Sequence, residues 1–344
     1  MSDISLTLLL ETCRSSYTKT NYIKRLNHFQ KFLGMELDDF VLLDNKIIEK
    51  HVMMYIIELK KIVSPNTIPS YLTPVRSFLV MNDILLNWKK IQKFYPNRVK
   101  LSGQSAYSTE DVQKMLSVTT KLYTKALIHV LASTGCRVGA VGQIKMKDVR
   151  DVDHGCKMIK IYAGDIEEYT TFLTPETSYA VDQFIKQRTD KGENITDESF
   201  LFNKKRYESL GRVSASMIIK RVAVKANVRG EKHDGRYNIQ ICHGFRKRFN
   251  TILKQNNNVN DNAIEKMMGH RNGLDGTYLQ ITDEELLGHF MKGVVDLTIS
   301  DEHRLKLETI ELQKEKVELE NKYEMRLKRL ERLQTITGKY DDDR

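Results

Sequence analysis

The sequence predicts a mainly α-helical protein with a small β-hairpin or sheet, built as two domains followed by a charged helix. Three observations support this fold class. Apolar residues recur at spacings of three and four through most of the first hundred residues. A single later stretch, KMIKIYAGDIEEYTTFLTPE, carries the β-branched and aromatic residues typical of a hairpin. Near the C-terminus, EHRLKLETIELQKEKVELENKYEMRLKRLERLQ is dense in charge and free of glycine and proline.

Residues 1–100 are expected to form the first domain, a small helical bundle. Its first two helices are indicated by two apolar series, Tyr22, Leu26, Phe29 and Leu33, and then Ile48, Val52, Tyr55, Ile56 and Leu59. A third helix is predicted after Ser64 and Asn66, whose side-chain oxygens can cap it. Pro74 inside this helix removes one internal hydrogen bond, so a kink is expected there.

Residues 105–298 are expected to form the second domain. The segment YPNRVKLSGQSAYSTEDV precedes and enters it, and its proline, glycine, serine and basic residues are typical of a linker. Ser108 and Asp111 have the spacing of a capping box, which marks a helix start. KLYTKALIHVLASTG then predicts a buried helix that ends at Gly135. The hairpin is expected to turn at the Gly-Asp pair, and DEELLGHFMKGVVDLTI favours a final core helix.

Residues 299–344 are expected to form a long charged helix. Leu305, Leu312 and Leu319 repeat at seven positions, but Arg326 breaks the series. Such a thin apolar stripe is compatible with a self-associating coiled coil, and equally with a helix that docks on its own protein.

The composition narrows the class of partner. The chain has 344 residues and a formal net charge of +10, which favours a polyanion, nucleic acid above all. Its four cysteines are widely scattered, so neither a zinc site nor a disulfide framework is predicted. The N-terminus lacks the pattern of a signal peptide, and no segment is apolar enough to span a membrane. We expect a soluble, cytoplasmic protein without a membrane partner, a metal or a cofactor.

Three separated segments carry residues suited to phosphate chemistry. They are STGCRVGAVGQIKMKDV with Arg137, CHGFRKRFNTIL with His243 and Arg246, and MMGHRNGLDGTYLQ with His270 and Tyr278. Each segment alone has a purely structural explanation. The arginine can be a solvated residue at a helix start, the histidine can cap a helix, and the glycine before His270 can end one.

Together, and in this order, the motifs TGCR, HGFR, GH and GTY closely resemble those of the tyrosine recombinase family, the lambda-integrase-like site-specific recombinases. The resemblance extends from the helical first domain to just past Tyr278, and the acidic turn and charged tail look most like archaeal or archaeal-virus integrases. It implies a DNA core-binding domain followed by a catalytic domain. It also implies an enzyme that integrates or excises mobile DNA through a covalent 3′-phosphotyrosine, with neither ATP nor metal. The implied partners are double-stranded DNA and three further copies of the chain, as a homo-tetramer on two DNA sites.

The residue types make chemical sense of that resemblance. Arg137 and Arg246 can grip the non-bridging oxygens of one phosphodiester and stabilise its transition-state charge. Tyr278 is the expected nucleophile, and its phenol must lose a proton as it attacks phosphorus. His243 is the candidate for proton transfer, and His270 for a hydrogen bond to the scissile phosphate.

Two positions depart from the family pattern. The family has an acidic residue three positions after the first arginine, where this chain has Ala140. The family also places a lysine in the hairpin turn to protonate the leaving 5′ oxygen, whereas this turn reads AGDIEEY. Lys160 is the tentative general acid, with Lys157 as the alternative; the two residues point to opposite faces of the strand.

DNA-backbone contacts are expected from five basic residues, Lys247, Arg248, Lys204, Lys205 and Arg206. Two other functions stay open. A type IB topoisomerase-like nicking and resealing enzyme would share the arginine, histidine and tyrosine chemistry. A DNA-binding protein with an impaired catalytic centre would explain the missing lysine and Ala140. The segment after Tyr278 also has a second interpretation, because in the family it often packs on a neighbouring subunit.

Overall fold

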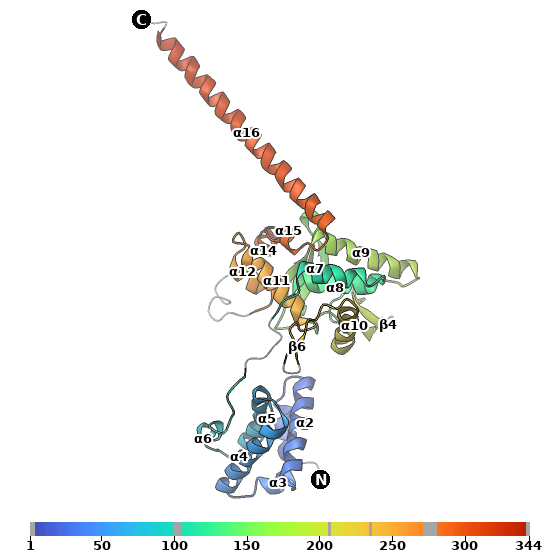
Figure 1. The fold of residues 1–344 in the computed structure, drawn as a ribbon, viewed down its shortest axis with the longest axis vertical. Helices are drawn as coiled ribbons and strands as arrows, with labels where there is room; N and C mark the ends of the chain where they lie inside the picture. Colours follow the sequence, from blue (N-terminus) through green and yellow to red (C-terminus); the bar gives the residue numbers. More distant parts are fainter. Residues whose placement is uncertain (1–3, 100–104, 206–207, 234–235, 271–280, 342–344) are drawn as a thin grey trace. The chain divides into compact units, whose positions relative to one another are not determined.

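The computed structural model describes residues 4–99, 105–205, 208–233, 236–270 and 281–341 (Figure 1). The chain folds as two compact units, Met1–Leu101 and Ser102–Arg344. The fold is mainly α-helical with small sheets, which confirms the predicted fold class. Within the described ranges, none of the helices combines the length and the apolar character needed to cross a bilayer.

The first unit is a bundle in which the predicted apolar series line the core. Its helices are α1 (Ile4–Glu11), α2 (Ser16–Leu33), α3 (Leu37–Phe40), α4 (Asn45–Ile62), α5 (Ile68–Met81) and α6 (Trp88–Gln92). All five apolar residues of the α4 series are completely buried, as are Leu26 and Phe29 of α2. Helix α2 begins at a side-chain cap from Ser15 and ends at Gly34, whose φ is 69°. The periodicity of the sequence therefore identifies this core correctly.

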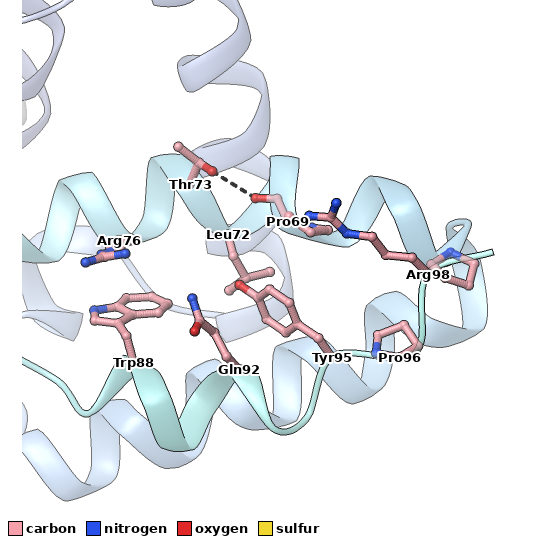
Figure 2. A pocket seen from close by; sticks show the side chains of 10 residues that line it. Pro69, Leu72, Thr73, Arg76, Trp88, Gln92, Tyr95, Pro96 and Arg98 are labelled. Carbon is pink, nitrogen blue, oxygen red and sulfur yellow. Dashed lines mark hydrogen bonds between the residues drawn. The ribbon is translucent and has the colours of Figure 1, made fainter. Parts of the chain in front are cut away.

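Helix α5 continues through Pro74, which is buried in the bundle. The hydroxyl of Thr73, one residue earlier, donates a hydrogen bond to the carbonyl of Pro69 at 2.9 Å. Helices α5 and α6 and the chain after α6 enclose a cavity of about 440 Å³ (Figure 2). Its lining contains two arginines, Arg76 and Arg98, and no acidic residue. The Arg76 guanidinium carbon lies 5.4 Å from the centre of the Trp88 ring, so this hollow is both basic and aromatic.

The second unit is organised around a three-stranded antiparallel sheet in the order β1-β2-β3. The strands are β1 (Val149–Asp151), β2 (Lys157–Ile161) and β3 (Tyr169–Leu173), and the β2–β3 hairpin confirms the predicted one. Strand β1 was not predicted, because three residues are too few to show an alternating pattern. The sheet separates two clusters of buried residues: Ile159 and Ile161 belong to one, and Phe172 to the other.

Helices surround the sheet, and two small hairpins complete the unit. The helices are α7 (Thr109–Ser117), α8 (Leu122–Thr134), α9 (Pro175–Asp190), α10 (Arg212–Lys225), α11 (His243–Gln255), α12 (Asp261–Met267), α14 (Asp283–Met291) and α15 (Val294–Leu297). The hairpins pair β4 (Asn203–Lys205) with β5 (Glu208–Ser209), and β6 (Lys232–His233) with β7 (Arg236–Tyr237). Helix α7 starts at the predicted capping box of Ser108 and Asp111, and α8 ends at Gly135 as predicted.

The last part of the core departs from the sequence-based expectation. Instead of one final helix, α14 and α15 are separated at Gly293, where an added Cβ would come within 2.2 Å of the Leu253 side chain. The apolar residues of both helices pack into their own unit, with Leu286, Phe290, Val294 and Leu297 buried. Within one chain, this segment is therefore part of the core, as the first of its two interpretations predicts.

Helix α16 (Asp301–Asp341) is the predicted charged helix and continues as one element in Figure 1. Its start is fixed by Glu176, whose carboxylate accepts hydrogen bonds from the backbone N–H groups of Ile299 at 2.8 Å and Ser300 at 3.0 Å. Leu307 still packs against the core, whereas Leu312 and Leu319 are exposed.

Candidate active site

Three segments far apart in the sequence meet at the guanidinium group of Arg246. Its Nη1 donates a hydrogen bond to the carbonyl oxygen of Gly135 at 2.8 Å. Its Nη2 donates to the carbonyl oxygen of Met268 at 2.6 Å and lies 2.7 Å from Nε2 of His270. Arg246 is only 5% exposed, and these bonds fix its position beside the other two segments. The structure thus brings together the TGCR, HGFR and GH motifs.

Local helix boundaries place these residues. Helix α8 ends at Gly135, whose φ of 57° turns the chain, so that Arg137 follows just outside the helix. Helix α11 begins at His243 and carries Arg246 one turn later on its buried face. Helix α12 ends just before Gly269, which has a φ of 64°. An added Cβ at Gly269 would lie 2.3 Å from the ring of Tyr169, so both the backbone and the packing require glycine.

His270 is held from both of its ring nitrogens. Its Nδ1 is hydrogen-bonded to the carboxylate of Glu265, which also pairs with Lys254 at 2.6 Å. Because an arginine can only donate, Nε2 is the acceptor toward Arg246, and Nδ1 therefore carries the proton. Burial raises the pKa of Glu265, but the hydrogen bonds from Lys254 and His270 lower it more, so it stays ionised. The ionised Glu265 thus orients the ring and turns Nε2 toward Arg246.

Arg137 is 45% exposed and faces the hairpin turn. Its Nη1 lies 3.8 Å from Oε2 of Glu167, which belongs to the acidic turn. Ala140 is completely buried and offers no charge. The carboxylate that accompanies Arg137 therefore comes from the turn between β2 and β3.

His243 is exposed at the start of α11, and within the described residues it forms no hydrogen bond to Arg137 or His270. Burial of part of the ring and the charges of Lys247 and Arg246 lower the pKa of His243. The imidazole is therefore neutral at neutral pH, the state required of a proton acceptor.

The two candidate lysines lie on opposite faces of β2, as predicted. Lys157 pairs with Asp151 at 2.6 Å and with Asp182 at 3.1 Å. Lys160 lies 3.7 Å from Glu168, at the far end of the hairpin turn. Within the described ranges, both lysines are therefore paired with carboxylates.

Arg248 corrects one prediction. It is 1% exposed, and its Nη2 donates to the hydroxyl of Thr109 at 3.0 Å and to the carbonyl of Leu297 at 3.2 Å. Because position 248 is three residues after Phe245, it lies on the buried face of α11 and is not a DNA-contacting residue. Burial lowers the pKa of Arg248 to about 10, although Glu176 and Glu110 act in the opposite direction.

The other predicted DNA contacts have mixed outcomes. Lys204 is exposed on β4, and Lys247 is partly buried on α11, where burial lowers its pKa. The side chain of Lys205, all of Arg206 and the expected nucleophile Tyr278 lie outside the described residues.

Two tyrosines that the sequence-based reasoning missed lie beside this site. Tyr169 is 7% exposed under Gly269, and its hydroxyl makes no hydrogen bond of good geometry within the described residues. Burial raises the pKa of Tyr169 strongly, and the nearby Arg246 guanidinium opposes that effect. Tyr162 starts the hairpin turn with a φ of 56°, and its ring centre is 6.5 Å from that of Tyr169. The sequence offered one signal for these two tyrosines, namely that they flank the predicted hairpin turn.

Comparison with solved structures shows the fold class. A lambda integrase tetramer bound to a Holliday junction has a TM-score of 0.56 and 14% identity, covering 82% of this chain and 79% of that chain. A fragment of the Tn1549 transposon integrase in complex with transposon right end DNA has a TM-score of 0.58 and 16% identity, covering 84% of this chain and 98% of that chain. The fold is therefore that of the lambda-integrase-like tyrosine recombinases.

The chain belongs to the phage integrase family, whose model matches residues 107–281. It is also similar to the tyrosine recombinase XerC of Caldanaerobacter subterraneus subsp. tengcongensis, with 24% identity over 162 residues. That match covers 47% of this chain and 42% of the XerC chain, so the chain spans less than half the length of this curated relative. The family match includes the segments of Arg137, His243, Arg246, His270 and Tyr278.

Proposed function

We propose that the protein is a site-specific DNA recombinase or integrase, which cleaves and rejoins DNA strands through a covalent 3′-phosphotyrosine at Tyr278, without ATP or metal. The observation that carries the proposal is the convergence of three motifs on Arg246. Membership of the phage integrase family supports the same reaction class.

In this proposal, Arg137 and Arg246 hold the two non-bridging oxygens of the scissile phosphate. The three hydrogen bonds that fix Arg246 mean that little reorganisation is needed when charge develops on those oxygens. Arg137 is exposed, and its ion pair among the described residues is with Glu167 at 3.8 Å, so a phosphate can replace that carboxylate at modest cost.

The histidines have different roles in the proposed mechanism. Neutral His243 accepts the proton of Tyr278 as its phenol attacks phosphorus, because the lowered pKa of His243 keeps the ring unprotonated. His270 is held by Glu265 through Nδ1, so its Nε2 faces Arg246 and the position proposed for the phosphate, where it contacts a phosphate oxygen.

DNA binding is proposed to use both units. Residues 1–100 act as the core-binding domain and residues 105–298 as the catalytic domain. Exposed Lys204, partly buried Lys247 and the arginines of the α5–α6 hollow supply phosphate contacts, which position the duplex without reading its sequence. Four protomers assemble on two DNA sites. The exposed leucines of residues 299–344 give this assembly an additional contact between copies.

A covalent-capture experiment tests the proposed function. The full chain is incubated with a library of nicked duplexes, and protein–DNA complexes that resist denaturant are isolated and sequenced to obtain the site. Wild-type protein should form such complexes, and Tyr278→Phe should form none. Tyr179→Phe is the matched control, because Tyr179 is exposed on α9 and should behave as wild type.

Each contrary outcome has a distinct meaning. If wild-type protein bound DNA but formed no covalent complex, the protein would be a DNA-binding protein with an impaired catalytic centre. A covalent complex formed by Tyr278→Phe would show that another residue is the nucleophile. Resealing of one duplex without joining of two sites would identify a topoisomerase-like enzyme.

A further inference from the structure

We propose that Tyr162 is the general acid of strand cleavage and that its phenol gives the proton to the leaving 5′ oxygen. This inference rests on the proposed function and supplies the proton donor that the acidic turn lacks. The leaving oxygen of a phosphodiester needs a proton because an alkoxide is a poor leaving group.

The hairpin geometry places Tyr162 at the site. Strand β2 ends at Ile161, and Tyr162 follows with a φ of 56°, a left-handed conformation that is rare for an aromatic residue. The turn is fixed by a hydrogen bond from the Asp165 N–H to the Tyr162 carbonyl at 2.9 Å. A second bond joins the Gly164 N–H to the Glu168 carboxylate at 2.6 Å. The unusual backbone at Tyr162 is therefore held by the turn itself.

Two residues near Tyr162 in the hairpin, Glu167 and Tyr169, each lie close to a segment of the candidate site. On one side, Glu167 of the same turn lies 3.8 Å from Arg137. On the other side, the centre of the Tyr162 ring lies 6.5 Å from that of Tyr169, which packs closely against Gly269. Tyr162 thus belongs to the turn that carries the partner of Arg137, and its ring neighbours the tyrosine that packs against Gly269.

The charge environment suits proton donation. Burial raises the pKa of Tyr162, so the phenol is protonated at neutral pH. The positive charges of Arg137 and Arg246 act in the opposite direction and stabilise the phenolate that remains after the proton has left. With an ordinary pKa of about 10, a phenol is close in acid strength to a lysine ammonium group.

Other proton-bearing groups at the site are less suitable. Tyr169 is almost fully buried, and burial raises the pKa of the Cys136 thiol to about 11. His243 is neutral at neutral pH because its pKa is lowered. Lys160 pairs with Glu168 at 3.7 Å, at the far end of the turn from Tyr162. Tyr162 is half-buried, so its side chain is partly accessible to a duplex at the surface.

The proposed step balances. The Tyr278 oxygen forms a bond to phosphorus as its proton passes to His243. The bond from phosphorus to the 5′ oxygen breaks, and that oxygen takes the Tyr162 proton, which leaves a 5′ hydroxyl and a Tyr162 phenolate. On rejoining, the attacking 5′ hydroxyl returns its proton to Tyr162, and the Tyr278 oxygen leaves phosphorus with the proton held on His243.

The test compares two nicked substrates with the captured site, one with the normal 5′ bridging oxygen and one with sulfur in its place. A thiolate leaves without a proton, so sulfur removes the need for a general acid. Tyr162→Phe should cleave the oxygen substrate at least about 100-fold more slowly than wild type and the sulfur substrate at nearly the wild-type rate. Tyr162→Lys should recover part of the loss on oxygen, because it restores a donor.

Lys160→Met is the matched control, and it should show no selective loss on oxygen if Tyr162 is the donor. A wild-type rate of Tyr162→Phe on oxygen would overturn the inference. So would an equal loss on both substrates, which would mean that Tyr162 only supports the fold. Failure of the wild-type protein on both substrates would instead overturn the proposed function together with this step.

Discussion

Arg246 of α11 donates a hydrogen bond across 2.7 Å to Nε2 of His270, which lies 24 positions later, just beyond the end of α12. The same guanidinium also holds the carbonyls of Gly135 and Met268. The buried Arg246 side chain therefore has two roles. It holds three separate segments of the chain together, and it presents positive charge toward the position proposed for the phosphate. Variants of Arg246 should separate these roles from each other.

Arg246→Ala should abolish covalent complex formation and also destabilise the second unit. Its removal leaves two carbonyls and His270 unpaired, with an expected cost of about 2–4 kcal/mol in free energy of unfolding. Arg246→Lys keeps the charge but cannot reach three partners at once, so cleavage should fall by about 100-fold or more with a smaller loss of stability. Cleavage rates and urea unfolding curves measure the two effects. Equal cleavage by Arg246→Lys and wild type would contradict the role of the fixed guanidinium.

Gly269→Ala should lower stability through both backbone strain and a clash with Tyr169. The matched control is Gly192→Ala, because Gly192 has a φ of 78° but an added Cβ there would meet nothing within 4 Å. The control should cost about 1 kcal/mol, and Gly269→Ala about 1–3 kcal/mol more. Thermal or urea unfolding measures the difference. Identical losses would mean that the Tyr169 ring moves aside freely.

Arg248→Ala should weaken the fold without changing the salt dependence of DNA binding. Its hydrogen bond to Leu297 is buried and that to Thr109 is partly buried, so their loss should cost about 2–4 kcal/mol in free energy of unfolding. Lys204→Ala should do the reverse: stability stays nearly constant, while the slope of log affinity against log salt falls by about 1. Filter binding or fluorescence anisotropy at several salt concentrations distinguishes them. A reduced slope for folded Arg248→Ala would restore it as a phosphate contact.

Glu265 should contribute stability only while it is ionised. Its folded pKa is lowered, so its contribution is complete above the unfolded pKa and is lost as the pH falls through the folded value. Wild type should therefore be more stable than Glu265→Gln at about pH 7, and the difference should shrink as the pH falls below the ordinary glutamate pKa of about 4.3. Urea unfolding across that range measures it. A difference that grows on acidification would contradict the assigned direction.

His243 should set the acidic limit of cleavage. A base must be unprotonated, and the lowered pKa of His243 keeps it so below the usual range of a histidine. The cleavage rate should therefore show its acidic fall below the ordinary histidine pKa of about 6.5. Single-turnover cleavage measures this profile, and His243→Gln should be slow and lack that acidic fall. An unchanged profile in His243→Gln would assign the titration to another group.

The sequence by itself determined the elements whose signals are local. The series from Ile48 to Leu59 follows the helical period, and that period alone requires a buried face. Ser108 and Gly135 mark helix boundaries because capping and left-handed turns depend on the residue and its immediate neighbours. The order of the four motifs was likewise readable in one dimension, and it indicated the family that the comparison shows.

Tertiary structure alone decided which side chains share the site. Arg248 is a basic residue of the kind that contacts DNA. Its face of α11, however, is covered by residues that are distant in the sequence, such as Thr109 and Leu297. The register of the β2–β3 hairpin determines where Tyr162 and Tyr169 lie. The packing of α12 near Arg246 determines that Glu265 reaches His270. The physical reason is the same in each case. Burial and charge depend on every segment that packs nearby, whereas capping and periodicity are settled within a few residues.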